Sequence, residues 1–250
     1  MSGDQYLNGV IQKYAINVAG AEAAGQSIYP VIVRWGNEYL VKAEFSGSLA
    51  KGTAISIGTD ADIFISMSST TPGTLAGLYG TLYNALTAAG YAARKQNVSI
   101  GVKANGYNVD LVPARRQSQN GNDHSLYKNK SNSWTQTNVI THINHVKSSN
   151  RIAEIKLAKI WRQLNNLDFP SFYLEMAVID SLKYSTVGDT ASNFLKVLQF
   201  FRDNLTSVRY TDPANTNNVI SDDLNASQKL VVANMARTST GKKTWGEIVR

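Results

Sequence analysis

Two aspartates separated by one residue, Asp60 and Asp62, lie at the start of an apolar run that predicts a β-strand over residues 61–67. Side chains alternate between the two faces of a strand, so both carboxylates are expected on one face. A Gly-Ser pair, Gly47 and Ser48, precedes them and predicts a turn after a strand over residues 42–46. Because two ionised carboxylates this close repel each other, the pattern favours a cation between them. The alternative is a set of solvated surface aspartates.

A third aspartate occurs in a predicted β-hairpin. Residues 97–103 and 107–112 read as two strands joined by an Asn-Gly turn, and the second strand is apolar except for Asp110. A lone aspartate in such a strand is costly to bury without a partner. If this strand pairs near Asp60 and Asp62, three carboxylates meet in one cluster of the kind that Mg²⁺ prefers.

The rest of the chain predicts an α+β module followed by an all-helical module. The first module combines a small mixed sheet with helices, and the polar segment over residues 115–136 is expected to be ordered and to continue the sheet. We place the two domains at residues 1–136 and 137–250. Helices are expected over residues 4–24, 28–41, 74–90, 138–148, 151–165, 171–184, 189–206, 223–238 and 242–250.

Composition agrees with a globular protein: 43% of the residues are hydrophobic and 17% are charged. The chain has no cysteine, which excludes disulfides and thiolate metal sites. It shows neither a signal segment nor an apolar run long enough for a membrane helix, so we expect no membrane partner and a soluble, cytoplasmic protein. The net charge of +7 is dispersed, which favours a triphosphate pocket over a dedicated duplex-binding face.

The order of these motifs resembles the signature of the DNA polymerase beta-type nucleotidyltransferase superfamily. The shared features are the Gly-Ser pair, the eleven-residue gap over residues 49–59, the paired aspartates and the later third aspartate. Residues 151–165, 169–175 and 212–219 resemble the helical domain of oligoadenylate synthases, of bacterial cGAS/DncV-like enzymes and of archaeal CCA-adding enzymes. The likeness covers roughly residues 25–250 and implies a polymerase-beta-like catalytic module.

The resemblance implies a role for each residue of the motif. Asp60, Asp62 and Asp110 would hold two Mg²⁺ or Mn²⁺ ions, and Asp110 would accept the proton of an attacking hydroxyl. Gly47 and Ser48 would bind the β- and γ-phosphates of a nucleoside triphosphate, with a small residue needed at position 47 for close backbone approach.

Four further residues are candidates for nucleotide binding, each with a simpler alternative. Lys51 is either a phosphate contact or a surface charge. Lys159, with Lys156 as a rival, either reaches the triphosphate or is a solvated helix lysine. Ser171 and Tyr173 resemble positions that contact the base or sugar, although core packing explains Tyr173 equally well.

These features predict a Mg²⁺-dependent, template-independent nucleotidyltransferase that releases pyrophosphate from nucleoside triphosphates. In the leading hypothesis the acceptor is another nucleotide, and the product is an oligonucleotide or cyclic nucleotide signal of the kind used in antiviral defence. In the alternative the acceptor is an RNA 3′ end, a tRNA or a protein, and Arg115, Arg116, Lys128 and Lys130 line the acceptor channel. RNA or DNA would then be an acceptor or activator. A third hypothesis is a catalytically silent, nucleotide-binding regulator. The sequence leaves the oligomeric state open.

Overall fold

The computed structural model describes residues 2–58 and 60–250. Thr59, the last residue of the gap before Asp60, lies outside the described residues. The chain forms two compact units. One contains the described parts of residues 17–51 and 59–143, and the other those of residues 1–16, 52–58 and 144–250. We call them the sheet unit and the helical unit.

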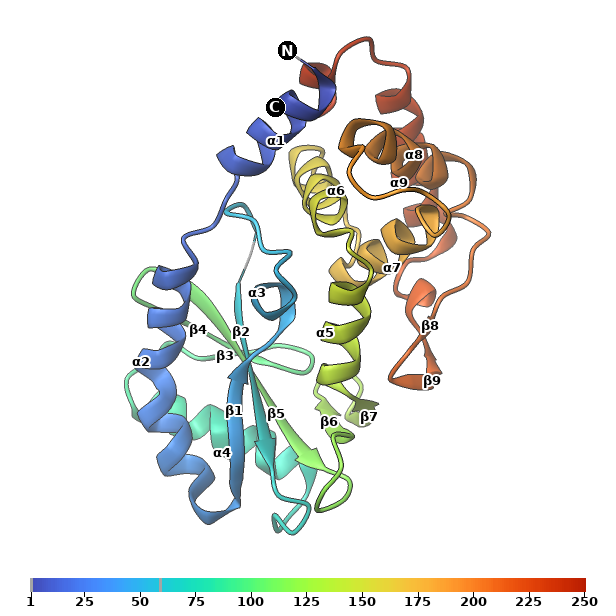
Figure 1. The fold of residues 1–250 in the computed structure, drawn as a ribbon. Helices are drawn as coiled ribbons and strands as arrows, with labels where there is room; N and C mark the ends of the chain where they lie inside the picture. The colour runs from blue at the N-terminus through green and yellow to red at the C-terminus, as the bar shows by residue number, and fades with distance from the viewer. Residues whose placement is uncertain (1, 59) are drawn as a thin grey trace. The chain divides into compact units, whose positions relative to one another are not determined.

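The sheet unit is built on one mixed β-sheet (Figure 1). The central strands follow the order β1-β2-β5-β4-β3, and β6 pairs with β5 and with β7. Strands β2 and β5 run parallel, whereas the other pairs are antiparallel. The strands are β1 Leu40–Phe45, β2 Ala61–Met67, β3 Arg94–Lys95, β4 Ile100–Ala104, β5 Tyr107–Arg116, β6 His124–Lys128 and β7 Ser133–Thr137.

Helices α2 and α4 pack on the sheet. Alternation along β2 and β5 separates the side chains into two faces: Ile63 and Leu111 are buried on one face, and Asp62 and Asp110 lie on the other. Gly25 of α2 lies against Ile63, so α2 covers the apolar face. The helical elements of this unit are α2 Val18–Gly36, η1 Asn37–Tyr39, α3 Gly47–Lys51, α4 Leu75–Ala88 and the first half of α5 Val139–Ser148.

The helical unit has a large apolar core that contains Trp161, Phe169 and Phe201. The Phe201 ring contacts the other two, with Phe169 and Phe201 centroids 5.4 Å apart. Such burial of large rings is the main driving force for this unit's folding. Its elements are α1 Gly3–Lys13, α6 Ile152–Leu164, α7 Ser171–Ser181, α8 Thr190–Asp203, β8 Thr211–Asp212, β9 Asn215–Val219, η2 Ile220–Asp223, α9 Ala226–Thr240, η3 Trp245–Glu247 and the second half of α5.

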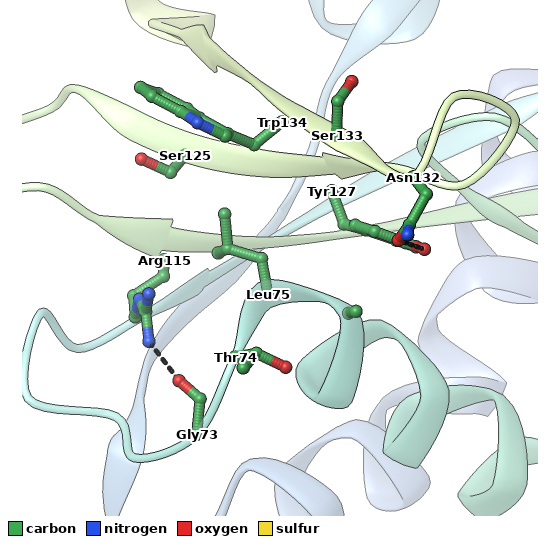
Figure 2. A pocket seen from close by; sticks show the side chains of 10 residues that line it. Gly73, Thr74, Leu75, Arg115, Ser125, Tyr127, Asn132, Ser133 and Trp134 are labelled. Atoms are coloured by element: carbon green, nitrogen blue, oxygen red, sulfur yellow. Dashed lines mark hydrogen bonds between the residues drawn. The ribbon is translucent and has the colours of Figure 1, made fainter.

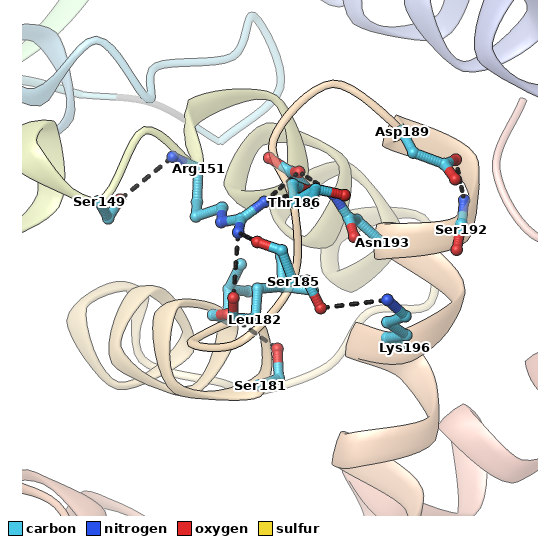
Figure 3. Close-up of polar contacts among 12 residues, drawn as sticks. Ser149, Arg151, Ser181, Leu182, Ser185, Thr186, Asp189, Ser192, Asn193 and Lys196 are labelled. Carbon is cyan, nitrogen blue, oxygen red and sulfur yellow. Dashed lines mark hydrogen bonds and ion pairs between the residues drawn. The ribbon is translucent and has the colours of Figure 1, made fainter.

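A buried arginine fixes the connection between α7 and α8 (Figure 3). The Arg151 guanidinium donates to the carbonyls of Leu182, Ser185 and Thr186, which follow the end of α7. Arg151 is 5% exposed and also pairs with the buried Glu154. A cation without these acceptors would be very costly to bury, so the network holds the loop in one conformation.

The predicted strand over residues 61–67 is confirmed, and so are the ordered extension of the sheet beyond residue 116 and most helices of the second half. The predicted helices over residues 4–24 and 28–41 are wrong, because the break falls between Lys13 and Val18 and α2 continues through Gly25. Asn17 caps the start of α2, accepting a hydrogen bond from the Gly20 amide. A β-carbon at position 25 would lie 2.5 Å from the Phe45 ring, so this glycine serves close packing.

Two further departures lie near the C-terminus. The second half is not purely helical, because β8 and β9 form a short antiparallel pair. The predicted helix over residues 242–250 is wrong as well, because only the turn η3 forms there, closed by a capping box between Thr244 and Glu247. The expected boundary after residue 136 lies near the end of the sheet unit at residue 143, whereas residues 2–16 and 52–58 belong to the helical unit. The assignment of catalytic and helical functions to residues 1–136 and 137–250 stays a prediction.

Candidate active site

The predicted adjacency of the carboxylate strands is confirmed. Strand β5 pairs in parallel with β2, and Asp110 is the register partner of Asp62. Asp60 directly precedes β2, and its Oδ1 accepts a hydrogen bond of 3.1 Å from Asn108 Nδ2. Asn108 and Asp110 are two residues apart on one strand and therefore share a face. The three aspartates thus gather on the sheet face opposite α2.

The turn that follows β1 lies directly beside Asp62. Gly47 has a φ of +55°, a conformation that favours glycine. A β-carbon at this position would also overlap the Asp62 carboxylate. The Ser46 amide donates to the Asp62 carbonyl at 2.8 Å, which ties the turn to β2. Gly47 and Ser48 begin the short helix α3, so the predicted turn at this pair is the start of a helix.

Asp110 is held by two polar side chains from the preceding segment. Gln96 Nε2 donates to Asp110 Oδ1 at 2.8 Å, and Ser99 Oγ lies 3.3 Å from Oδ2. Burial raises the pKa of Asp110 above its ordinary value, and the negative charge of Asp60 raises it further. The hydrogen bonds from Ser99 and Gln96 act in the opposite direction. The surroundings of Asp110 therefore increase the proton affinity of its carboxylate.

The donor set suits a hard divalent cation, because it consists of carboxylate oxygens on one face of two neighbouring strands. As they stand, however, the described residues contain no group of three or more acidic, histidine or cysteine side chains that could hold a metal ion. Asp60 and Asp110 are instead turned toward the amides of Asn108 and Gln96. The residue types and the shared face fit the predicted ions, whereas a closed three-carboxylate site is not formed.

A pocket of about 160 Å³ opens on the same face. Its walls include Gly47, Phe64 and Val112. Phe64 lies two residues after Asp62 on β2, and Val112 lies two residues after Asp110 on β5, so both share the face of the aspartates. Lys51 also lines this pocket and is 9% exposed, so it is not the freely solvated surface charge of the alternative prediction. The apolar walls suit a planar ring, and the cation suits a negatively charged group attached to it.

A second pocket, of about 540 Å³, lies on the opposite face of the sheet (Figure 2). Arg115, Ser125 and Tyr127 line it, and the register places their side chains away from the aspartates. Arg115 donates to the carbonyls of Thr71 and Gly73. The prediction that Arg115 lines one channel with Arg116 and Lys128 is therefore wrong, because neighbouring residues of β5 face opposite sides.

In the helical unit, the Lys159 ammonium is part of a buried network. Its Nζ donates to Glu175 Oε1 at 2.7 Å and to Thr53 Oγ1 at 2.8 Å, and Lys159 is 3% exposed. The alternative of a solvated helix lysine is therefore wrong. A contact with a triphosphate would require this ion pair to open, and that role stays a prediction.

The other two candidates of the helical unit differ in exposure. Tyr173 is fully buried, its ring packs edge-on against Phe169 and Tyr210, and its hydroxyl donates to the Leu205 carbonyl. Burial raises the pKa of Tyr173 to about 12. Core packing, the alternative for Tyr173, is what the structure shows, and its contact with the base or sugar stays a prediction. Ser171 begins α7 and accepts a hydrogen bond from Arg162, and its nucleotide contact stays a prediction.

Several polar residues of the site were missed from the sequence. Asn108 could have been found, because it precedes Asp110 by two residues and must share its face. Gln96 and Ser99 carry no such signal, because they lie in a loop whose folding back toward β5 is a tertiary feature. Glu175 and Thr53 were missed as partners of Lys159, since residue 53 is far from α6 in sequence.

Comparison with known proteins agrees with this arrangement. Residues 31–150 match the model of the Second Messenger Oligonucleotide or Dinucleotide Synthetase domain. Residues 31–150 are therefore similar to nucleotidyltransferase domains of this type. The domain carries the Gly-Ser turn and all three aspartates, and the predicted resemblance to polymerase beta-type nucleotidyltransferases is confirmed.

One curated relative and several solved structures are similar to this chain. Cyclic AMP-AMP-AMP synthase of Escherichia coli (strain MS 115-1) is 28% identical over 172 residues, which are 62% of this chain and 54% of that protein. The chain therefore spans about half the length of that relative.

The solved structures show the same fold. The structure of E. coli MS115-1 CdnC with ATP superposes with a TM-score of 0.73 at 22% identity, covering 94% of this chain and 89% of that one. The Bradyrhizobium diazoefficiens CD-NTase CdnG with GTP gives a TM-score of 0.81 at 13% identity, covering 96% and 90%. A cytoplasmic RNA terminal U-transferase gives 0.67 at 12% identity, covering 97% and 95%. The predicted α+β fold class is confirmed.

None of the helices in the described residues combines the length and the apolar character that a membrane-spanning helix requires.

Proposed function

We propose that this protein joins nucleoside triphosphates to one another, releasing pyrophosphate, and makes an oligonucleotide or cyclic oligonucleotide signal. The observation that carries the proposal is the pairing of Asp62 with Asp110 on adjacent parallel strands, with Asp60 on the same face and the Gly47 turn beside them. The match to a second-messenger synthetase domain and the likeness to a cyclic AMP-AMP-AMP synthase support it. We place the reaction in the cytoplasm, where nucleoside triphosphates are available.

In this proposal the acceptor hydroxyl forms a new bond to the α-phosphorus, and the bond between the α-phosphorus and the bridging oxygen to the β-phosphate breaks. Asp110 takes the hydroxyl proton as the general base. Ser48 and the backbone amides of the Gly47 turn bind the phosphates that leave as pyrophosphate. Lys51 adds a positive charge beside this turn.

Asp60, Asp62 and Asp110 would hold two Mg²⁺ or Mn²⁺ ions, which neutralise triphosphate charge and lower the pKa of an attacking hydroxyl. The shared face of the three carboxylates supports this assignment. The apolar pocket beside Gly47 would receive a planar base, with Phe64 and Val112 as its walls.

The proposal is tested by product analysis. The purified protein is incubated with Mg²⁺ or Mn²⁺ and each nucleoside triphosphate and deoxynucleoside triphosphate, singly and in mixtures, and the products are resolved by mass. A double variant, Asp60→Ala with Asp62→Ala, serves as the blank. A product that forms without added nucleic acid and is lost in the blank supports the proposal.

The same assay distinguishes the alternatives. Transfer that occurs only after RNA is added, with label moving to the RNA, contradicts the proposal in favour of an RNA-modifying enzyme. Nucleotide binding without any turnover supports a silent regulator. Because the E. coli MS115-1 relative has been solved in a CdnC:HORMA complex, the assay is repeated with candidate protein partners.

A further inference from the structure

The Asp110 carboxylate is held from one side by a small hydrogen-bonded network. Gln96 Nε2 lies 2.8 Å from Asp110 Oδ1, and Ser99 Oγ lies 3.3 Å from Oδ2. Ser99 Oγ is also 3.0 Å from Gln96 Oε1, so its single proton is shared between two acceptors. Each oxygen of the carboxylate therefore has one neutral donor. The terminal torsion of an aspartate side chain, χ2, otherwise has a broad range of values, and the two donors restrict it.

Gly101 leaves the space in which this network forms. It is the register partner of Asp110 on β4. A β-carbon on Gly101 would lie 2.6 Å from Gln96 Nε2 and 3.1 Å from Asp110 Oδ1. The absence of a side chain lets the amide reach across β4 to the carboxylate on β5.

A buried tyrosine fixes the loop that carries both donors. Tyr79 of α4 is 2% exposed, and its hydroxyl lies 2.9 Å from the Gln96 carbonyl and 2.8 Å from the Ser99 carbonyl. The loop is also closed by a backbone hydrogen bond from the Gln96 amide to the Ser99 carbonyl. Helix α4 thus sets the position of the loop, and the loop sets the position of the two donors.

We propose that Gln96 and Ser99 are positioning residues that aim the Asp110 carboxylate at the acceptor hydroxyl and at the metal ions. This inference depends on the proposed function. Both side chains act through Asp110 and touch neither substrate nor ion. By occupying one lone pair of each oxygen, they restrict the orientation of the carboxylate and leave its remaining lone pairs for the metal ions and the acceptor hydroxyl.

The test replaces the amide while keeping its approximate size. Gln96→Leu is expected to lower kcat about 10- to 100-fold and to change the KM for nucleoside triphosphate by less than about twofold, because orientation matters in the reacting complex. Ser99→Ala is expected to show the same split with a smaller loss, and Ser99→Thr, which keeps the hydroxyl, is expected to restore most of the rate. Gln117→Leu is the matched control, since the Gln117 side chain donates to Ser125 Oγ in an exposed position.

Two measurements without turnover separate positioning from folding. Mn²⁺ titration in the absence of nucleotide is expected to show several-fold weaker binding to Gln96→Leu than to the wild type, and thermal melting is expected to show both proteins folded at the assay temperature. Unchanged kcat and Mn²⁺ affinity in the folded Gln96→Leu variant would overturn the inference. The inference would also be overturned if the loss of kcat in Gln96→Leu equalled the fraction of unfolded protein, or if Gln117→Leu lost as much activity.

Failure of the proposed function has a different signature. If the wild type makes no nucleotide product under any condition, the proposed reaction fails. The Mn²⁺ titration still tests whether Gln96 positions Asp110 for a metal ion.

Discussion

Gly47 and Asp62 are in such close contact that no side chain could occupy position 47 without displacing the Asp62 carboxylate. The positive φ of Gly47 adds a second reason for glycine at this position. The turn after β1 and the Asp62 carboxylate on β2 therefore fit together only when position 47 is glycine.

Replacing Gly47 with alanine is expected to abolish nucleotidyl transfer. The substitution places a methyl group against the Asp62 carboxylate and costs about 1–2 kcal/mol of backbone strain as well. Activity and urea denaturation measure the two effects. Gly52→Ala is the control, because Gly52 also has a positive φ, of +77°, but has open space around it. Equal activity losses in both variants would show that strain alone explains the effect.

The buried ion pair between Lys159 and Glu175 provides a second prediction. Lys159→Met should destabilise the protein by up to about 3–5 kcal/mol, because it removes the ammonium that pairs with the buried Glu175 carboxylate. The double variant with Glu175→Gln should recover most of that loss. Urea denaturation measures both. If Lys159 instead binds the triphosphate, the single variant remains nearly as stable as the wild type and its KM for nucleoside triphosphate rises.

Tyr173→Phe should leave the KM for nucleoside triphosphate unchanged. The substitution keeps the ring packed against Phe169 and removes only the hydroxyl that donates to the Leu205 carbonyl. A loss of about 1 kcal/mol in the free energy of unfolding is expected. A clear rise in KM without loss of stability would indicate that Tyr173 contacts the nucleotide.

His124 makes the stability of the sheet unit depend on pH. Its Nε2 lies 2.8 Å from Ser66 Oγ, and burial lowers its pKa below the ordinary value of 6.5. His124 therefore takes up a proton near pH 6.5 in the unfolded chain, but only at a lower pH in the folded chain. The associated stability is fully present above pH 6.5 and is lost as the pH falls toward the lower folded pKa.

This dependence is measured by urea denaturation at pH 7.5 and at pH 5.5. His124→Gln, which keeps a polar side chain and cannot titrate, should reduce the difference between the two values. An unchanged difference would assign the acid sensitivity to other groups.

Local sequence patterns predicted the parts of the site that lie along single strands. Alternation predicted that Asp60 and Asp62 share a face, as the structure has them, and the Asn-Gly turn located the hairpin that presents Asp110. The predicted helix break over residues 25–27 is wrong, because Gly25 serves close packing against Phe45 inside α2. A glycine signals that a side chain would not fit, and sequence alone does not say whether a turn or a neighbour is the reason.

What the sequence by itself determined was the set of chemical groups, their order and their strand faces, because these depend on the identity of each residue and on the two-residue period of a strand. Tertiary structure alone decided which groups meet. It brought Gln96 and Ser99 to Asp110 and buried Lys159 between Glu175 and Thr53. These contacts depend on how loops and helices pack against one another, and burial then decides which charges need partners.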